Sequence, residues 1–117
     1  MPYLVRKIQD ANPTQITCGV MRKLTTSNDF KDMDMVYVTI TDSTKKHFHK
    51  KITEVYYVLN GSIDIEIDGK IEHLEKDQMI MIFPNTNHKV WKTSGDDAEI
   101  LVVCCPPWSE EDEILIE

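Results

Sequence analysis

Apolar and polar residues alternate along much of this 117-residue chain, as they do in half-buried β-strands. In residues 62–67 the side chains of Ile63, Ile65 and Ile67 fall on one face, and acidic side chains fall on the other. Residues 35–41 alternate in the same way and are rich in β-branched side chains. Because no long helical period interrupts these segments, the pattern predicts an all-β domain.

Turn signals divide the rest of the chain into short segments. The pairs Asn60-Gly61 and Asp68-Gly69 are typical of tight hairpins, because these residue types tolerate positive φ. Residues 79–83 are apolar on both faces, which predicts a strand packed on both sides. Further strands are predicted at residues 3–5, 16–25 (a strand or a strand pair bent at Gly19), 54–59, 71–74, 88–93 and 99–105. An antiparallel jelly-roll β-barrel accommodates such strands and covers their edges.

Composition narrows the function. The formal net charge of −7 and the lack of a basic stripe argue against a nucleic-acid partner. No apolar run reaches the length of a membrane span, and the N-terminus lacks a signal-peptide layout. Cys18, Cys104 and Cys105 are odd in number, without Cys-x-x-Cys spacing, and are expected to be reduced packing residues. We therefore expect a cytoplasmic protein with no membrane partner.

The candidate chemistry centres on His47, His49 and Glu54. On a strand the two histidines project to one side, about 7 Å apart, and can converge on one metal ion. A short turn then leads to a second strand that opens with Glu54, which can face the histidines if the two strands pair antiparallel. His-x-His alone is common by chance, so the longer spacing matters.

This spacing resembles the first motif of the cupin superfamily. Glu54 follows His49 by five positions, and Gly61 follows Glu54 by seven, as in that motif. The second cupin motif supplies a third histidine, which is matched by His88. Asp77, Phe83 and Asn85 stand where the family usually has Gly, Pro and Gly, and Asn85 is a tolerable replacement because Asn accepts a left-handed turn.

The resemblance covers about residues 33–105 and implies a single cupin domain over residues 1–117. This domain would have N-terminal strands in residues 1–32 and an acidic C-terminal tail in residues 106–117, docked on the barrel or on a partner subunit. The implied cofactor is one divalent transition metal ion (Fe, Mn, Ni, Co, Cu or Zn). Its implied ligands are His47, His49, Glu54 and His88. The remaining histidine, His73, is expected at the surface.

The resemblance implies a small single-domain, mannose-6-phosphate-isomerase-like member that acts on a small oxygenated metabolite. The substrate would be a sugar or a keto or carboxylic acid, and the reaction that of an isomerase, lyase or dioxygenase. The alternatives are a non-catalytic sugar-binding cupin and a purely structural metal barrel.

Strand parity adds a catalytic candidate and an interface. Tyr56 shares the face of Glu54 and could donate a hydrogen bond to bound oxygen, or simply fill the barrel. Met79 and Met81 are candidates for the cavity wall or for gap-filling. An outward apolar set needs a cover, for which a homodimer is favoured over the second sheet or the termini. This set is Val55, Tyr57, Leu59 and Trp91.

Overall fold

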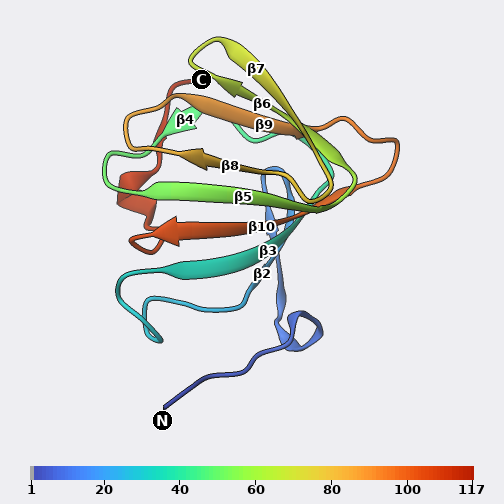
Figure 1. The fold of residues 1–117 in the computed structure, drawn as a ribbon. Helices are drawn as coiled ribbons and strands as arrows, with labels where there is room; N and C mark the ends of the chain where they lie inside the picture. The colour runs from blue at the N-terminus through green and yellow to red at the C-terminus, as the bar shows by residue number, and fades with distance from the viewer. Residues whose placement is uncertain (1) are drawn as a thin grey trace.

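The computed structural model describes residues 2–117 and contains two antiparallel sheets that face each other (Figure 1). The first sheet has the order β1 (Pro13–Ile16), β2 (Gly19–Lys23), β3 (Asp34–Ile40), β10 (Ala98–Cys105), β5 (Thr53–Asn60) and β8 (Met79–Ile82). The second has the order β11 (Ile114–Leu115), β4 (His47–Phe48), β9 (His88–Lys92), β6 (Ser62–Ile67) and β7 (Lys70–Glu75). Two single-turn 3₁₀ helices are present, η1 (Ile8–Asp10) and η2 (Glu110–Asp112). The predicted all-β jelly-roll barrel is confirmed.

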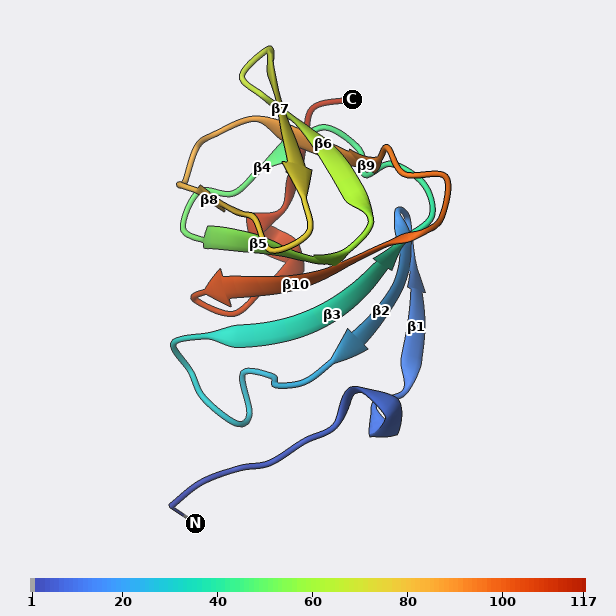
Figure 2. The same cartoon turned by 45° about the vertical axis from the view of Figure 1, so that its right-hand side comes forward.

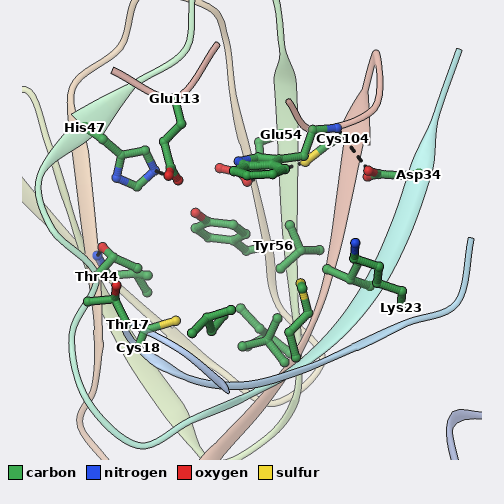
Figure 3. Close-up of a pocket in the computed structure, with 18 of the residues that line it drawn as sticks. Thr17, Cys18, Lys23, Asp34, Thr44, His47, Glu54, Tyr56, Cys104 and Glu113 are labelled. Atoms are coloured by element: carbon green, nitrogen blue, oxygen red, sulfur yellow. Dashed lines mark hydrogen bonds and ion pairs between the residues drawn. The ribbon is translucent and has the colours of Figure 1, made fainter. Parts of the chain in front are cut away.

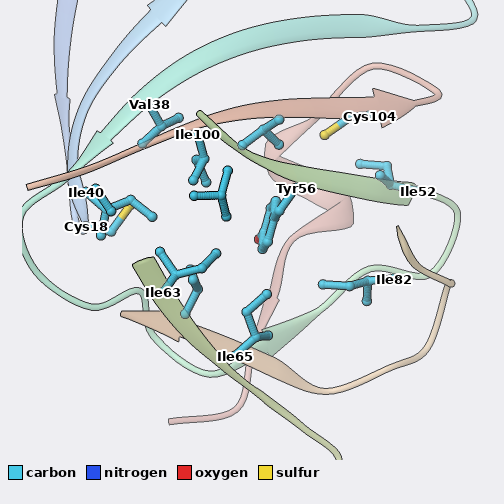
Figure 4. Packing of buried hydrophobic residues seen from close by; sticks show 14 residues of the cluster. Cys18, Val38, Ile40, Ile52, Tyr56, Ile63, Ile65, Ile82, Ile100 and Cys104 are labelled. Atoms are coloured by element: carbon cyan, nitrogen blue, oxygen red, sulfur yellow. The ribbon is translucent and has the colours of Figure 1, made fainter. Parts of the chain in front are cut away.

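The core lies between the two sheets and is built from the apolar positions of the alternating strands (Figure 4). Ile63 and Ile65 of β6 and Ile40 of β3 are fully buried, as the alternation predicts. Each such side chain stabilises the fold by about 1.5–3 kcal/mol relative to an exposed one. The inward faces of the strands therefore hold the two sheets together.

One of the two predicted hairpins forms, and the other does not. Asp68 and Gly69 have positive φ of 46° and 86° and connect β6 to β7 as a tight antiparallel hairpin, so that prediction is confirmed. Asn60-Gly61 is not a hairpin, because β5 pairs with β8 and β10 whereas β6 pairs with β7 and β9. At Gly61, with φ 75°, the chain crosses from one sheet to the other. A turn dipeptide indicates the local backbone conformation, but it does not indicate with which strand the next strand pairs.

The prediction that residues 79–83 are packed on both sides is wrong. Met79 and Met81 are each 46% exposed, and Phe83 is 62% exposed. β8 is an edge strand of its sheet, so only its inward side chains meet the core. Met79 and Met81 pair with Tyr57 and Val55 on β5 and share their outward face.

The outward residues predicted to need a cover are half-buried within the single chain. Neither the facing sheet nor the termini remove the neighbouring Met79, Met81 and Phe83 from solvent. The homodimer remains a prediction.

The N-terminal segment extends away from the barrel, whereas the C-terminal segment packs on it (Figure 2). The predicted strand at residues 3–5 is wrong: this segment has no strand pairing, and Tyr3 and Val5 are 73% and 74% exposed. The C-terminal tail docks on the barrel, where Ile114 and Leu115 of β11 pair with β4. Within residues 2–117, no helix is both long and apolar enough to cross a membrane.

Gly19 opens β2 directly after a tight turn and lies between β1 and β3. Its φ is +155°, and an added Cβ would overlap the backbone carbonyl of Thr39. We expect Gly19→Ala to lower the free energy of unfolding by about 1–3 kcal/mol, because the strands must separate to admit the methyl group. Urea denaturation measures this loss. Gly95→Ala, at an open position, is the matched control, and equal stability of the two variants would contradict the close approach.

Candidate metal centre

Four side chains meet at one end of the barrel interior: His47 on β4, His49 just after it, Glu54 on β5 and His88 on β9. Each offers a ligand atom, and these atoms all lie within 4.8 Å of one another. The four residues are between 1% and 6% exposed. The structure thus brings together every residue of the predicted ligand set.

Glu54 does not face the histidines through antiparallel pairing of its strand with theirs, which was the sequence-based expectation. β4 and β5 belong to different sheets, and β4 pairs with β9, where His47 lies opposite His88. Glu54 approaches from the facing sheet, with Oε1 at 3.2 Å from His88 Nε2 and 3.7 Å from His49 Nε2. The cluster therefore spans both sheets.

The backbone orients all three imidazole rings in the same way. The Nδ1 atom of each histidine lies within hydrogen-bond distance of a main-chain carbonyl oxygen, and a carbonyl only accepts, so Nδ1 carries the proton. The acceptors are Lys45, Asp112 and Thr86, at 2.7, 2.9 and 2.9 Å from His47, His49 and His88 respectively. Each Nε2 therefore faces the cluster, and that of His88 lies within hydrogen-bond distance of Glu54 Oε1; metal-ligating histidines are commonly oriented through Nδ1 in this way.

Opposing effects act on the charges of the cluster. Burial works to raise the pKa of Glu54, but the hydrogen bond and charge of His88 outweigh it, so this pKa is lowered. Burial works to lower the pKa of His88, and Glu54 raises it overall. The pKa of His47 is lowered by burial and by the neighbouring His88.

One ring nitrogen is left over. No atom of the described chain forms a hydrogen bond with the buried Nε2 of His49. A buried polar atom without a partner is costly, and a divalent cation between the four side chains would satisfy it. Three nitrogens and one carboxylate form a donor set that suits first-row divalent ions, so the residues present fit such an ion.

A cavity of about 520 Å³ extends from the cluster between the two sheets (Figure 3). His47 and Glu54 form part of its wall, and most of the remaining wall is apolar. Tyr56 points into this space, and its pKa is raised well above the ordinary value by burial and by Glu54. The phenol is therefore neutral and available as a hydrogen-bond donor. Its catalytic role stays a prediction.

Cys104 lines the same cavity, and its thiol donates a hydrogen bond of 3.6 Å to Glu54 Oε2. Burial and the nearby acids raise its pKa, so the thiol stays protonated. Met79 and Met81 face away from the cavity. His73 lies on β7 at the surface, as predicted, paired with Asp64 and Glu75.

A family model described as a cupin domain matches residues 34–104 of the chain. The chain belongs to the cupin family. It is 28% identical over 103 residues to the uncharacterized protein MJ1618 of Methanocaldococcus jannaschii, across 85% of this chain and 82% of that protein.

Solved structures share the fold of this cupin. A protein from Planctomyces limnophilus superposes with a TM-score of 0.85 and 24% identity, over 98% of this chain and 97% of the other. Pac13, described as a nucleoside dehydratase, has a TM-score of 0.84 and 14% identity over 98% and 92% of the two chains. A Streptomyces Pac13 variant solved with uridine has a TM-score of 0.86 and 14% identity, over 100% and 93% of the chains.

The departures of this cupin from the usual second motif are structurally conservative. Asp77 and Asn85 replace glycines, and both adopt positive φ, at 68° and 64°. The Asn85 amide donates a hydrogen bond to the carbonyl of His49. Asp and Asn are the non-glycine residues that reach this conformation most readily, so both positions accept the left-handed backbone without glycine.

The C-terminal segment of this cupin contributes to the site. From the sequence, its docking on the barrel or on a partner subunit was left open. The carboxylate of Asp112 accepts hydrogen bonds from the amides of Lys50, Lys51 and Ile52. The main-chain carbonyl of Asp112 accepts the hydrogen bond from Nδ1 that orients His49. Burial works to raise the pKa of Asp112, but these amides lower it overall. The only sequence signal for this contact is an acidic stretch with an apolar end, which does not name a partner.

Glu113 follows directly in the chain, and its Oε1 lies 3.9 Å from His47 Nε2 at the cavity wall (Figure 3). The tail thus places the main-chain carbonyl of Asp112 at Nδ1 of His49 and the carboxylate of Glu113 near Nε2 of His47.

We expect Asp112→Ala to lower the free energy of unfolding by about 1–3 kcal/mol, because it leaves the buried amide of Ile52 without its acceptor. The variant should also weaken binding of a divalent ion by about 10–100-fold, since the loop and the orientation of His49 loosen together. Thermal unfolding and calorimetric titration with metal measure the two effects. Glu111→Ala, an exposed neighbour in η2, is the control, and equal behaviour of the two variants would contradict this role.

Proposed function

We propose that this cupin binds one divalent transition metal ion through His47, His49, Glu54 and His88, and that it is an enzyme acting on a small oxygenated metabolite. The convergence of four buried ligand atoms within 4.8 Å, with the three Nε2 atoms oriented by main-chain carbonyls, carries this proposal. A set of three imidazoles and one carboxylate is consistent with iron, manganese, nickel, cobalt, copper or zinc.

The cavity favours a substrate-binding centre over a purely structural one. A structural zinc site is closed by four protein ligands, whereas an octahedral ion keeps two positions for other ligands. Here two of the ligand residues, His47 and Glu54, form part of the wall of a cavity large enough for a small metabolite. When bound, the ion supplies Lewis acidity to an oxygen of the substrate.

The residues that line the cavity would then have different roles. Tyr56, held neutral inside the cavity, donates a hydrogen bond to a substrate oxygen beside Glu54. The apolar walls exclude water and strengthen that hydrogen bond. Isomerase, lyase or dioxygenase chemistry on a sugar or a keto or carboxylic acid is compatible with such a centre.

The second candidate is a binding protein that holds a small molecule without turnover. Pac13, which is described as a nucleoside dehydratase and of which a variant was solved with uridine, supports a small-molecule ligand for a barrel of this shape. The same cavity serves a catalyst or a receptor, and turnover of a candidate substrate distinguishes them.

We also propose a cytoplasmic location and a homodimer. Three free cysteines, two of them buried, support a reducing compartment. The exposed Met79, Met81 and Phe83, on and next to an edge strand, support a self-association surface.

Protein purified without chelators should contain about one transition metal ion per chain by elemental analysis. We expect His88→Ala to lose that ion, and His73→Ala, at the surface, to retain it. Saturating metal at about 100 times its Kd should stabilise the wild type by about 2.7 kcal/mol, because the ion binds the folded state alone. Full metal occupancy in the His88 variant would remove this residue from the centre.

Metal affinity should fall as the solution becomes acidic. Ligating imidazoles must be neutral, and protons compete with the ion for Nε2, first at His88, whose pKa is raised above the ordinary histidine value of about 6.5. Metal affinity therefore begins to fall at or above about pH 6.5 and falls further toward pH 5. Calorimetric titration between pH 8 and pH 5 measures this, and an affinity that stays constant across the range would contradict ligation by imidazole.

A further inference from the structure

A solvent-accessible tryptophan forms part of the cavity wall. Trp108 follows the end of β10, lines the cavity and is 46% exposed. The wall residues nearer to the metal centre are buried, with Tyr56 at 4%, Val102 at 7% and Cys104 at 3% exposure. Trp108 therefore lies where the cavity meets solvent, within reach of a ligand.

A buried carboxylate holds the backbone of Trp108. The amide of Trp108 donates a hydrogen bond of 2.9 Å to Oδ2 of Asp34 on β3, which is 8% exposed (Figure 3). Burial raises the pKa of Asp34, and the hydrogen bonds from Trp108 and from Cys104 offset part of this effect. A buried carboxylate is costly unless it accepts such bonds, so Asp34 acts as a positioning residue for Trp108.

The chain on both sides of Trp108 is restrained as well. Pro106 and Pro107 precede it, and their rings fix φ. Further along, the carboxylate of Asp112 accepts a hydrogen bond from the buried amide of Ile52. The segment cannot carry Trp108 away from the cavity without breaking buried hydrogen bonds. Its backbone is thus ordered before a ligand binds, which lowers the entropy lost on binding.

The distance from this segment to the metal centre follows from the strand order. Asp34 is paired with Cys104, and Cys104 is paired in turn with Glu54. Two strand spacings place the backbones of the two acids about 10 Å apart. The Trp108 segment, bonded to Asp34, and the metal centre are therefore separated by about the length of a small molecule that carries a ring.

An ordered and half-exposed indole has a specific use beside a cavity. A tryptophan that served only to close the barrel would bury most of its surface. The indole offers a wide apolar face and a single N–H donor, and that face stacks on flat rings. The neighbouring wall is largely apolar and would take the other side of such a ring.

We propose that the indole of Trp108 is a stacking platform of this cavity, on which a ring of the substrate packs while the oxygen-bearing end of the substrate meets the metal centre. This inference rests on the proposed function for the metal end. The substrate class becomes a small molecule with metal-binding oxygens at one end and a ring with an apolar face at the other.

The chain contains two tryptophans, so the emission of each can be observed alone. Trp91→Phe leaves Trp108 as the emitter, and Trp108→Phe leaves Trp91, which lies on β9 outside the described cavity wall. The probes are benzohydroxamic acid and acetohydroxamic acid, which share a metal-binding hydroxamate and differ by a ring in place of a methyl group. In manganese-loaded Trp91→Phe, benzohydroxamic acid should quench the emission of Trp108 to saturation, and acetohydroxamic acid should not. Neither probe should quench Trp91 in Trp108→Phe.

Calorimetric titration measures the contribution of the indole to affinity. We expect Trp108→Ala to bind benzohydroxamic acid at least about fivefold more weakly than the wild type, with the affinity for acetohydroxamic acid unchanged. Tyr3→Ala, which removes an aromatic side chain that is 73% exposed and outside the cavity wall, is the matched control and should change neither affinity. Thermal unfolding shows that each variant is folded.

Two kinds of result would overturn the inference, and they differ. Suppose that both probes bind only when the ion is present. Unquenched emission of Trp108 at saturating benzohydroxamic acid, or undiminished affinity in Trp108→Ala, would then remove the stacking platform and leave the metal centre intact. If neither probe binds in a metal-dependent way, the open metal centre of the proposed function is wrong, and the platform fails with it.

Discussion

The need to satisfy the inner nitrogen of each buried histidine governs the arrangement of the candidate site. A buried Nδ1–H requires an acceptor, and main-chain carbonyls from three separate segments provide it. Once these bonds form, the rings can no longer rotate freely, and the three Nε2 atoms face one another and Glu54. The chemistry of the site depends on the positions of backbone carbonyls as much as on the histidines themselves.

This requirement also explains the role of the C-terminal tail. Asp112 supplies the acceptor for His49 and, through its carboxylate, holds the amides that follow that histidine. β11 then adds to the edge of β4 and secures the segment. A tail that carries a high density of acids is stable here because its buried carboxylate meets amides, whereas Glu113 remains at the cavity wall.

The cavity combines this centre with a largely apolar interior. Tyr56 and Cys104 remain protonated because burial and the nearby acids oppose ionisation, and the thiol of Cys104 donates a hydrogen bond to Glu54.

The sequence by itself determined the all-β class, the inward positions of the alternating strands and the candidate ligand set, because side-chain alternation and motif spacing are local properties of the chain. It also indicated that position 85 could take a left-handed conformation. Only the tertiary structure decided that Gly61 joins two sheets, that Met79 and Met81 face outward, and that Asp112 contacts His49. These outcomes depend on which distant segments pair across the barrel, and neither a turn dipeptide nor an acidic residue carries information about a partner 60 or more positions away.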